Sequence, residues 1–520
     1  MLYFIRLVWV EREKEEMWQL VMVLTDYLSP LLLLISIIWI STVIILNSRA
    51  RRPTNLPPGP FPLSIIGNIL VLGPKPHQSL AKLSREYGPV MSLKLGTITT
   101  VVISSPEAAR AVLQKHDLAF SSRKISIASK TLSHDVFSMV WLPVDVQWRK
   151  LRKICREQLF SGPRLDSGQG LRREKLGQLR GYVKSCRDSG RAVDVGEAAF
   201  TTVLNLMSAT LFSEEFAGFG SGSSHEIRDV VWGVMRSIGK PNLADFFPVL
   251  RRVDPQGIQR DTEYYFGRLF QIFDRIIDEK LRCRGDNNNI KDDLLEALIE
   301  LHLKAELSRD DIKHLLLDLF AAGTDTSSST VEWAMTELLR HPSKLSTLRK
   351  EINDVINGVQ NDQQSVQESD IPRLPYLQAV VKETLRLHPP APLLVPHKAN
   401  ADVEVNDYIV PKDAQVLVNV WASGRDPNVW PDAEVFLPER FLGREVDYRG
   451  NEFELIPFGA GRRICPGLPL AHRMVHLMLA TLVGSFEWRI EGGVESEVLD
   501  MDEKFGITLQ KAVPLRAVPV

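Results

Sequence analysis

The first clear pattern along the chain is an uncharged apolar run, LSPLLLLISIIWISTVIIL, from Leu28 to Leu46. Its length is close to the roughly 20 helical residues that cross the hydrocarbon core of a bilayer. Arg49, Arg51 and Arg52 follow at once, and basic residues beside a membrane span remain on the cytosolic side. The pattern predicts a transmembrane anchor over residues 28–48, with the rest of the chain facing the cytosol. A cleaved signal peptide fits less well because no small-residue cleavage site follows, and a core helix fits less well because the run lacks a polar face.

The segments on either side of this run carry different signals. Residues 1–27 include the charged stretch EREKEE, which predicts a solvated tail, although translation could also start at Met17 or Met22. Residues 49–62 contain prolines at 57, 58, 60 and 62, which restrict φ and remove backbone donors. We therefore expect a stiff hinge there, or alternatively a ligand for a proline-binding module. No second linker of this kind follows, so residues 63–520 are expected to form one domain.

A long helical pattern runs from Ser308 to Pro342. Ser308 and Asp311 match a capping box at its start, and the proline ends it. Its centre, AAGTDTSSST, is rich in glycine and hydroxyl residues, which are poor helix formers. Small residues allow close approach to the helix backbone, and Asp325 and Thr326 place an acid and a hydroxyl there. The alternative is a polar kink in a core helix.

A second helical pattern, LPYLQAVVKETLRLHPP, ends at Pro390 and contains Glu383 and Arg386 on one face. Apolar neighbours surround this pair, which predicts that it is partly buried and needs a further partner. Arg440, in the loop FLPERF, can supply that partner. The alternative is an exposed ion pair of little energetic weight.

Composition and cysteine usage narrow the function. The chain has 520 residues, 44% hydrophobic and 24% charged, with a formal net charge of −1, so no global basic field recruits nucleic acid. Its four cysteines, Cys155, Cys186, Cys283 and Cys465, form no closely spaced pairs. This spacing argues against a disulfide scaffold or a structural zinc site.

The most distinctive short segment is PFGAGRRICPG, from Pro457 to Gly467. Cys465 lies just before a helical pattern that starts at Leu468, and a helix N-terminus favours a thiolate. The glycines permit a tight loop beneath a flat partner, and Arg463 can meet an anionic group on that partner. A lone thiolate suits neither zinc nor an iron–sulfur cluster, but it suits a metal whose other ligands come from elsewhere, as in haem. The alternative is a buried, inert cysteine.

At these residues the chain resembles the cytochrome P-450 family. Phe458, Gly461, Arg463, Cys465 and Gly467 fit that family's highly specific haem-binding signature, F-x-x-G-x-R-x-C-x-G. The remaining motifs that carry the resemblance are AGTDTS from Ala322 to Ser327, the E-x-x-R pair Glu383 and Arg386 with Arg440, and the W-x-x-x-R pair Trp148 and Arg152. The resemblance extends from about Leu28 to the C-terminus and includes the anchor and hinge typical of microsomal members.

The resemblance implies a fold and a cofactor. The expected fold is mainly α with a smaller β-rich region, in one large domain behind an N-terminal transmembrane helix. The expected cofactor is haem b, with Cys465 as the axial thiolate ligand of its iron. Charge-assisted bonds to its propionates would come from side chains that we expect to surround it: Trp148, Arg152, His397 and Arg463. Phe458, Gly461 and Gly467 would shape the loop beneath it.

The resemblance also implies an activity and its partners. Asp325 and Thr326 would deliver protons for oxygen activation, and Glu383, Arg386 and Arg440 would be structural. Electrons would come from NADPH through a separate membrane-bound cytochrome P-450 reductase, since no flavin- or dinucleotide-binding segment is present. A basic helix face with Arg149, Lys150 and Lys153 is a candidate docking site for it, or an ordinary solvated face. The expected location is the endoplasmic reticulum membrane.

A narrower likeness concerns the substrate. Segments such as LPYLQAVVKETLRLHPPAP and FELIPFGAGRRICPGLPLAHRM resemble plant terpenoid hydroxylases, most closely the geraniol 8-hydroxylase group. The resemblance implies a largely apolar substrate pocket, with lining residues Phe320, Ala321, Ala322, Leu394, Val395 and Ile507. The first expectation is hydroxylation of a monoterpenoid alcohol. A diterpenoid, alkaloid or phenolic substrate is the main rival, and a non-oxygenating isomerase, a dehydratase or a haem-binding protein on the same fold are others.

Overall fold

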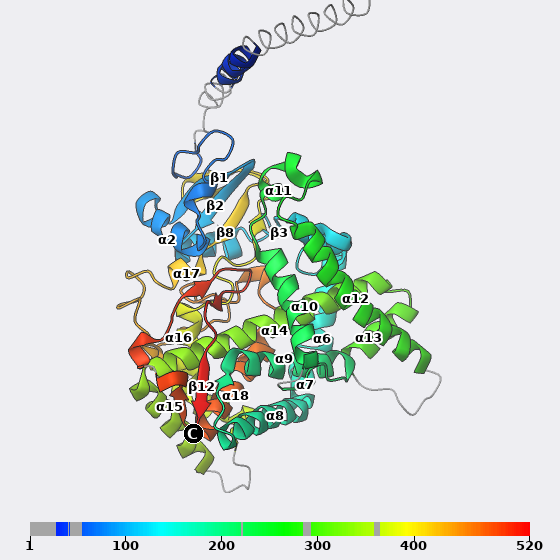
Figure 1. Cartoon of the computed structure of the whole chain (residues 1–520), viewed down its shortest axis with the longest axis vertical. Helices are drawn as coiled ribbons and strands as arrows, with labels where there is room; N and C mark the ends of the chain where they lie inside the picture. Colours follow the sequence, from blue (N-terminus) through cyan, green and yellow to red (C-terminus); the bar gives the residue numbers. More distant parts are fainter. Residues whose placement is uncertain are drawn as a thin grey trace, which may run out of the picture.

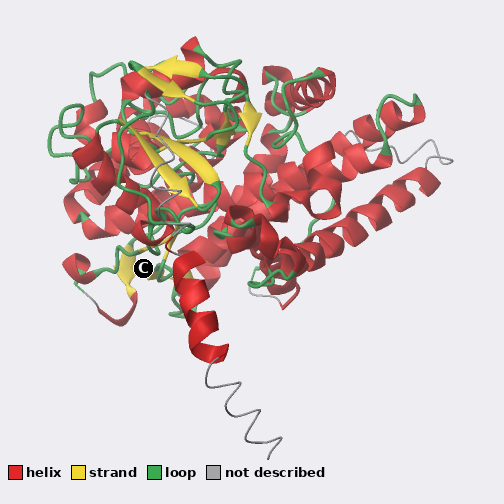
Figure 2. Ribbon diagram, turned by 90° about the horizontal axis from the view of Figure 1, so that it is seen from above, coloured by secondary structure: helices red, strands yellow, loops and turns green. Residues whose placement is uncertain are grey.

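The computed structural model describes residues 28–39, 41, 55–219, 222–283, 293–357, 365–493 and 495–520. These residues form a mainly helical molecule with a smaller β-rich region, which confirms this part of the expected fold class (Figure 1). Seen from above, most strands gather on one side of the molecule while long helices make up the other (Figure 2).

The helices form the larger part of the described chain. They are α2 (Pro76–Tyr87), α3 (Pro106–Arg110), α4 (Ile127–Lys130), α5 (His134–Phe137), α6 (Val146–Gln158), α7 (Gly162–Ser167), α8 (Gln169–Asp188), α9 (Val195–Phe212), α10 (Gly222–Gly239), α11 (Leu243–Phe246), α12 (Ile258–Cys283), α13 (Leu294–Leu303), α14 (Arg309–Arg340), α15 (Pro342–Asn357), α16 (Pro375–Leu387), α17 (Val420–Ser423) and α18 (Leu468–Ser485).

The strands form one larger sheet and three small ones. The five-stranded sheet has the order β1 (Val90–Leu95), β2 (Ile98–Ile103), β8 (Gln415–Val418), β5 (His397–Lys398) and β3 (Ser122–Arg123). The pair β2 and β8 is parallel, and the other pairs are antiparallel. The small sheets consist of β4 (Val193–Asp194), β12 (Arg516–Pro519) and β9 (Trp488–Ile490), of β6 (Val403–Val405) and β7 (Tyr408–Val410), and of β10 (Glu503–Lys504) and β11 (Gln510–Lys511).

Helix α14 crosses the middle of the molecule and organises the main hydrophobic core (Figure 1). The predicted capping box is confirmed, because the Ser308 hydroxyl accepts from the Asp311 N–H at 3.0 Å while the Asp311 carboxylate accepts from the Ser308 N–H at 2.8 Å. The helix then continues for 32 residues through its polar centre. There the hydroxyls of Thr324, Thr326 and Ser328 donate to carbonyls four residues earlier, so these polar groups are satisfied without leaving the helix.

Two helices are apolar enough to bear on the question of a membrane span. The described residues contain one helix of sufficient length and hydropathy, α9, but most of it is buried in the core against α14. The expected anchor appears as a shorter apolar helix, Leu28–Trp39, with exposed side chains. Residues 40 and 42–54, which include the end of that anchor and the three arginines after it, lie outside the described residues.

The described part of the proline-rich hinge is bound to the β-rich region. The carbonyl oxygen of Pro58 accepts from the Ser92 N–H at 2.7 Å, and that of Pro57 accepts from the Ser92 hydroxyl at 2.6 Å. A side chain at Gly59 would place its Cβ within 1.9 Å of the Ser92 carbonyl oxygen, so only glycine permits this close approach. The hinge thus begins the domain, where it runs along β1.

Candidate active site

A largely apolar cavity lies between α14 and the loop that precedes α18. Its lining combines segments far apart in the chain, namely β3, α6, α9, α14, the 390–397 segment and the 457–474 segment. The predicted site residues that line it are Trp148, Arg152, Ala322, Thr326, Leu394, Val395, His397, Phe458, Arg463, Cys465 and Gly467. The fold therefore brings together most of the residues that the sequence motifs indicated.

Of the four cysteines, only Cys465 lines the cavity. Its N–H donates to the Phe458 carbonyl oxygen at 2.9 Å, which closes the loop. Gly461 has a φ of 65°, and a Cβ there would lie 2.0 Å from the Leu113 carbonyl oxygen, so this position requires glycine although it does not reach the cavity. The glycines that this loop requires explain why Cys465 could be identified from the sequence.

The electrostatic surroundings of Cys465 act in two directions. Burial raises the pKa of its thiol, whereas the Gly467 N–H, the Arg152 guanidinium and the Leu468 N–H lower it. These amides come from the start of α18, as expected for a helix N-terminus. Cys155 lies deeper, and burial raises its pKa to about 12, so it is an inert thiol by comparison. A bound metal ion would hold Cys465 as thiolate, since coordination deprotonates a thiol.

One wall of the cavity is cationic. Arg463 donates to the Ser121 carbonyl oxygen at 2.8 Å and to the Leu142 carbonyl oxygen, and Arg152 donates to the Ile464 carbonyl oxygen. Burial lowers the pKa of Arg463 to about 10. Trp148 and His397 complete this wall; the Trp148 indole N–H donates to the Met139 carbonyl oxygen at 3.1 Å, and His397 Nδ1 lies 2.7 Å from the Phe120 carbonyl oxygen.

Arg123 belongs to the same wall and was missed by sequence reasoning. It is the Cα partner of His397 in the β3–β5 ladder, and it donates to the Val395 carbonyl oxygen at 2.6 Å. Its Nε is buried without a partner, and burial, with the charge of Arg463, lowers its pKa to about 9. Within the described part of the chain no carboxylate pairs with Arg123, Arg152 or Arg463. An anionic group in the cavity would relieve this uncompensated positive charge.

The opposite wall is one face of α14. Asp318, Ala322 and Thr326 are spaced four residues apart and all line the cavity. Asp325 lies outside the lining, because its Oδ1 accepts from the Gln510 side chain of β11 at 2.8 Å. Burial raises the pKa of this carboxyl, although the Thr508 and Gln510 side chains oppose the shift. The two neighbouring residues predicted for proton delivery therefore face different surroundings.

Three residues expected in the substrate pocket lie elsewhere. Phe320 packs within the core, with its ring centroid 5.6 Å from that of Phe216 and 6.2 Å from that of Phe273. Ala321 is also buried outside the cavity lining. Ile507 lies against Gly239 in α10, whose Cβ would meet the Ile507 backbone. The lining residues Val203, Leu206 and Met207 come instead from α9.

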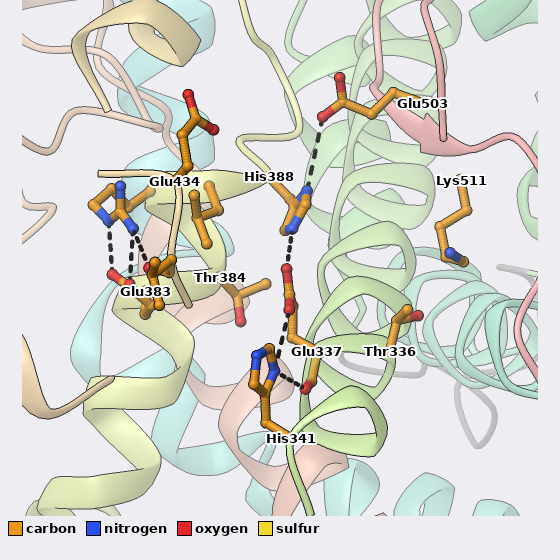
Figure 3. A network of polar contacts seen from close by, with 12 residues as sticks. Thr336, Glu337, His341, Glu383, Thr384, His388, Glu434, Glu503 and Lys511 are labelled. Carbon is orange, nitrogen blue, oxygen red and sulfur yellow. Dashed lines mark hydrogen bonds and ion pairs between the residues drawn. The ribbon is translucent and has the colours of Figure 1, made fainter. Parts of the chain in front are cut away.

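The predicted buried triad is assembled away from the cavity. Glu383, which is labelled in Figure 3, accepts from Arg386 Nε at 2.7 Å, from Arg440 Nε at 3.0 Å and from the Leu437 N–H at 2.7 Å. In the same view His388 lies between Glu337 and Glu503, with its Nε2 2.7 Å from Glu337 Oε1. These contacts connect α16 and the residue after it to the 437–440 segment, to the end of α14 and to β10.

Comparison with known proteins identifies the family. A model of the family described as cytochrome P-450 matches residues 57–514. The chain belongs to the cytochrome P-450 family. Geraniol 8-hydroxylase from Catharanthus roseus is 54% identical over 473 residues, covering 90% of this chain and 95% of that protein. Geraniol 8-hydroxylase from Swertia mussotii is 51% identical over 475 residues, which cover 91% of this chain and 95% of that protein. Ferruginol synthase from Salvia miltiorrhiza is 48% identical over 484 residues, which cover 92% of this chain and 97% of that protein.

Membership of the cytochrome P-450 family makes the chain a monooxygenase that uses a haem with a cysteine thiolate ligand and a reductase as electron donor. The residues of the cavity fit that cofactor. A thiol faces an apolar space, and the unpaired arginines, including the orphan Nε of Arg123, match the negative charge of haem carboxylates. Relatives named as hydroxylases favour oxygenation over the non-oxygenating alternatives.

Proposed function

We propose that this monooxygenase hydroxylates a monoterpenoid alcohol, with geraniol as the first candidate. The observation that carries the proposal is the apolar cavity, in which Cys465 and Thr326 belong to the same lining. Its extent and composition suit a lipophilic molecule beside the cofactor. The relatives named geraniol 8-hydroxylase cover nearly the whole chain, which supports the choice of a monoterpenoid.

In this proposal each wall of the cavity has its own task. Cys465 would ligate the iron of haem b, which when bound would supply the capacity to activate O2 for insertion into a C–H bond. The two propionates would be held by Arg123, Arg152, Arg463, His397 and Trp148. The Thr326 hydroxyl, which donates to the Ala322 carbonyl oxygen at 2.9 Å, is the proton donor at the cavity surface. Asp325, the residue before it on α14, would supply protons to it, while Ala322, Leu394 and Val395 exclude water.

We further propose that the protein is anchored in the endoplasmic reticulum membrane by residues 28–48 and receives electrons from NADPH through a separate reductase. Two features support this arrangement. The described part of the anchor is an apolar helix, and Arg149 and Lys153 of α6 are exposed while Arg152 of the same helix faces the cavity. An acidic partner surface would therefore meet basic residues on the helix that also carries a cofactor contact.

A diterpenoid is the second candidate substrate. It is favoured by the relative named ferruginol synthase, which matches 92% of this chain at 48% identity. Small changes in an apolar pocket alter substrate preference by only about 1–3 kcal/mol, so related pockets can prefer different terpenoids.

The test is a reconstituted assay with the full-length, haem-loaded protein, a plant reductase and NADPH. Geraniol, an abietane diterpenoid, a phenolic and an alkaloid are offered separately, and products are identified by mass spectrometry. We expect an NADPH-dependent hydroxylated product from geraniol. Turnover of the diterpenoid with no product from geraniol would overturn the proposed substrate class.

The cysteine assignment has its own measurement. The reduced, carbon monoxide-treated wild type should show the red-shifted Soret band of a thiolate-ligated haem, and Cys465→Ala should not. Cys283→Ala is the matched control, because that cysteine is exposed and distant from the cavity lining. A Cys465→Ala protein that kept the same band would refute the assignment.

A further inference from the structure

The cavity contains one acidic side chain, Asp318, in otherwise apolar and cationic surroundings. It lies on α14 two turns before Thr326, and only 7% of its surface is exposed. A carboxylate in such a place is costly unless its oxygens receive hydrogen bonds. The proton-delivery and cofactor contacts described above make no use of it.

Asp318 is held by a small polar network. The Ser138 hydroxyl lies 2.7 Å from its Oδ1 and 2.9 Å from its Oδ2, and His134 Nε2 lies 3.3 Å from Oδ1. His134 Nδ1 is in turn 2.8 Å from His314 Nδ1. The network therefore connects α14 to α5 and to the segment that follows it.

This network ends in an aromatic shell. The His314 ring is stacked on Phe137 with centroids 5.2 Å apart, and it meets Phe270 edge-on at 4.7 Å. Burial, with the neighbouring His134, lowers the pKa of His314 to about 4, so it stays neutral.

The hydrogen-bond count leaves acceptor capacity on Asp318. A carboxylate offers about four lone-pair sites, whereas Ser138 has one hydroxyl proton and His134 one N–H to give. The remaining sites belong to a side chain that lines the cavity. The carboxylate can therefore still accept a hydrogen bond from a donor in the cavity.

We propose that Asp318 accepts a hydrogen bond from the hydroxyl of the lipophilic substrate and thereby sets its orientation in the cavity. This inference rests on the proposed function, since it assigns the alcohol group of that substrate. Asp318 precedes Thr326 by eight residues, or about 12 Å along the helix axis at ~1.5 Å per residue. An alcohol held at Asp318 extends toward Thr326, so the carbon that is oxidised lies at the end of the molecule far from the hydroxyl.

The test compares geraniol with geranyl methyl ether, which has the same carbon skeleton but replaces the donor by a methyl group; the extra size acts equally on wild type and variants. Binding is measured by equilibrium dialysis with the full-length, haem-loaded protein. Because a hydrogen bond to a buried charge is among the stronger ones, wild type should bind the alcohol about tenfold or more tightly than the ether. Asp318→Leu should lose this preference and spread oxidation over several carbons, while Asp318→Asn should retain part of it.

Ser138→Ala separates binding from bracing. It removes the partner of Asp318 and leaves the carboxylate, so the preference for the alcohol should persist if the substrate bonds to Asp318. If Asp318 only braces Ser138, Ser138→Ala and Asp318→Leu should have the same effect, and the inference is wrong. Asp310→Leu is the matched control on the same helix, since Asp310 is exposed and pairs with Lys313.

The outcomes also distinguish this inference from the proposed function. Equal wild-type affinity for alcohol and ether, together with hydroxylation of geraniol, overturns the role of Asp318 and leaves the function intact. Failure of wild type to bind either compound overturns both. If Asp318→Leu does not fold, the comparison of Asp318→Asn with Ser138→Ala still decides, because both substitutions nearly preserve shape.

Discussion

At the residue scale, Arg123 is a buried cation with no counter-ion among the residues that the structure describes. It gives one hydrogen bond to the Val395 carbonyl oxygen, its Nε has no partner, and the nearby charge is that of Arg463. Such a group destabilises the protein on its own and becomes favourable when an anion is bound beside it. Arg123 should therefore destabilise the haem-free protein and stabilise the haem-bound protein.

We predict that Arg123→Met lowers haem retention while leaving the haem-free protein as stable as wild type or more stable. The bound haem loses a charge-assisted partner, about 1.5–3 kcal/mol or a tenfold or greater loss of affinity. The measurements are the haem-to-protein ratio after dialysis and the thermal unfolding midpoint of the haem-free chain. Arg110→Met is the control, because Arg110 covers the Phe453 ring at the surface. Equal destabilisation of both forms would contradict the prediction.

Glu383 is the converse case, a buried anion with complete partners. Replacing it by glutamine leaves Arg386 and Arg440 partly unpaired, and breaking a buried pair costs about 3–5 kcal/mol. We predict a clear fall in the urea midpoint followed by circular dichroism, together with loss of haem. Glu434→Gln, which removes an exposed partner of Arg425, should change the midpoint little. Similar midpoints for the two variants would argue against a structural role of the triad.

The site residues predictable from the sequence are those whose neighbours are local. Cys465 is recognisable because its loop needs glycines at fixed offsets, and Glu383 and Arg386 because they are one helical turn apart. Arg123 has no such signal. It reaches the site through a two-residue strand paired with His397, and the contact of Asp318 with Ser138, 180 positions away, is equally remote in sequence. Long-range pairing of this kind leaves no mark in a single sequence.

At the element scale, the phase of α14 decides which side chains face the cavity. Residues 318, 322 and 326 share a face, whereas Phe320 is two positions, or roughly 200°, away from Asp318. Phe320 and Ala321 were expected in the pocket because they directly precede the AGTDTS motif in the sequence. That expectation did not take the rotation of the helix into account. Counting back from Thr326 in steps of four would have identified Asp318. The capping box and the end of the helix were predictable, because both depend on adjacent residues.

Glu332 gives α14 a pH-dependent contact with the C-terminal β-region. Its Oε1 accepts from the Leu515 N–H at 2.9 Å, and burial, with Asp194 and Asp325 nearby, raises its pKa to about 7, although that hydrogen bond and Lys511 oppose the shift. In the unfolded chain the carboxyl titrates near 4.5. Between these values the folded state binds more protons than the unfolded state, so stability falls as pH rises.

We predict that the titration of Glu332 lowers the free energy of unfolding between about pH 4.5 and about pH 7, by a total on the order of 3 kcal/mol. Above about pH 7, Glu332 should contribute little further change. Glu332→Gln should remove this part of the pH dependence and be more stable than wild type at pH 8. Urea unfolding at pH 5 and pH 8 measures the difference. An unchanged pH profile in Glu332→Gln would exclude the group, and Glu434→Gln again serves as the control for an exposed carboxylate.

At the scale of the whole molecule, exposed apolar residues gather where the chain enters the domain. Phe61 is 79% exposed, and Val249 and Val253, which follow α11, are 83% and 71% exposed. The segment that contains Phe61 and the segment that follows α11 meet at the turn between β1 and β2. There the Thr97 N–H donates to the Phe246 carbonyl oxygen at 3.0 Å. In Figure 1 α11 and β1 lie at the end of the molecule from which the N-terminal helix extends. This surface faces the same way as the proposed anchor.

We predict that a chain beginning at residue 55 still binds vesicles containing anionic lipids, through this surface. Arg251 and Arg252 lie beside Val249 and Val253 and are exposed, so charge and apolar burial act together. Burying a valine or phenylalanine side chain gains about 1.5–3 kcal/mol. The double substitution Phe61→Ser and Val249→Ser should therefore weaken the vesicle affinity measured by co-sedimentation about a hundredfold. Leu303→Ser with Val513→Ser replaces exposed apolar residues elsewhere, 60% and 52% exposed, and should leave binding unchanged. If both double variants bind alike, the domain touches the bilayer through another surface, and the orientation of the cavity relative to the membrane must differ from the one that this patch implies.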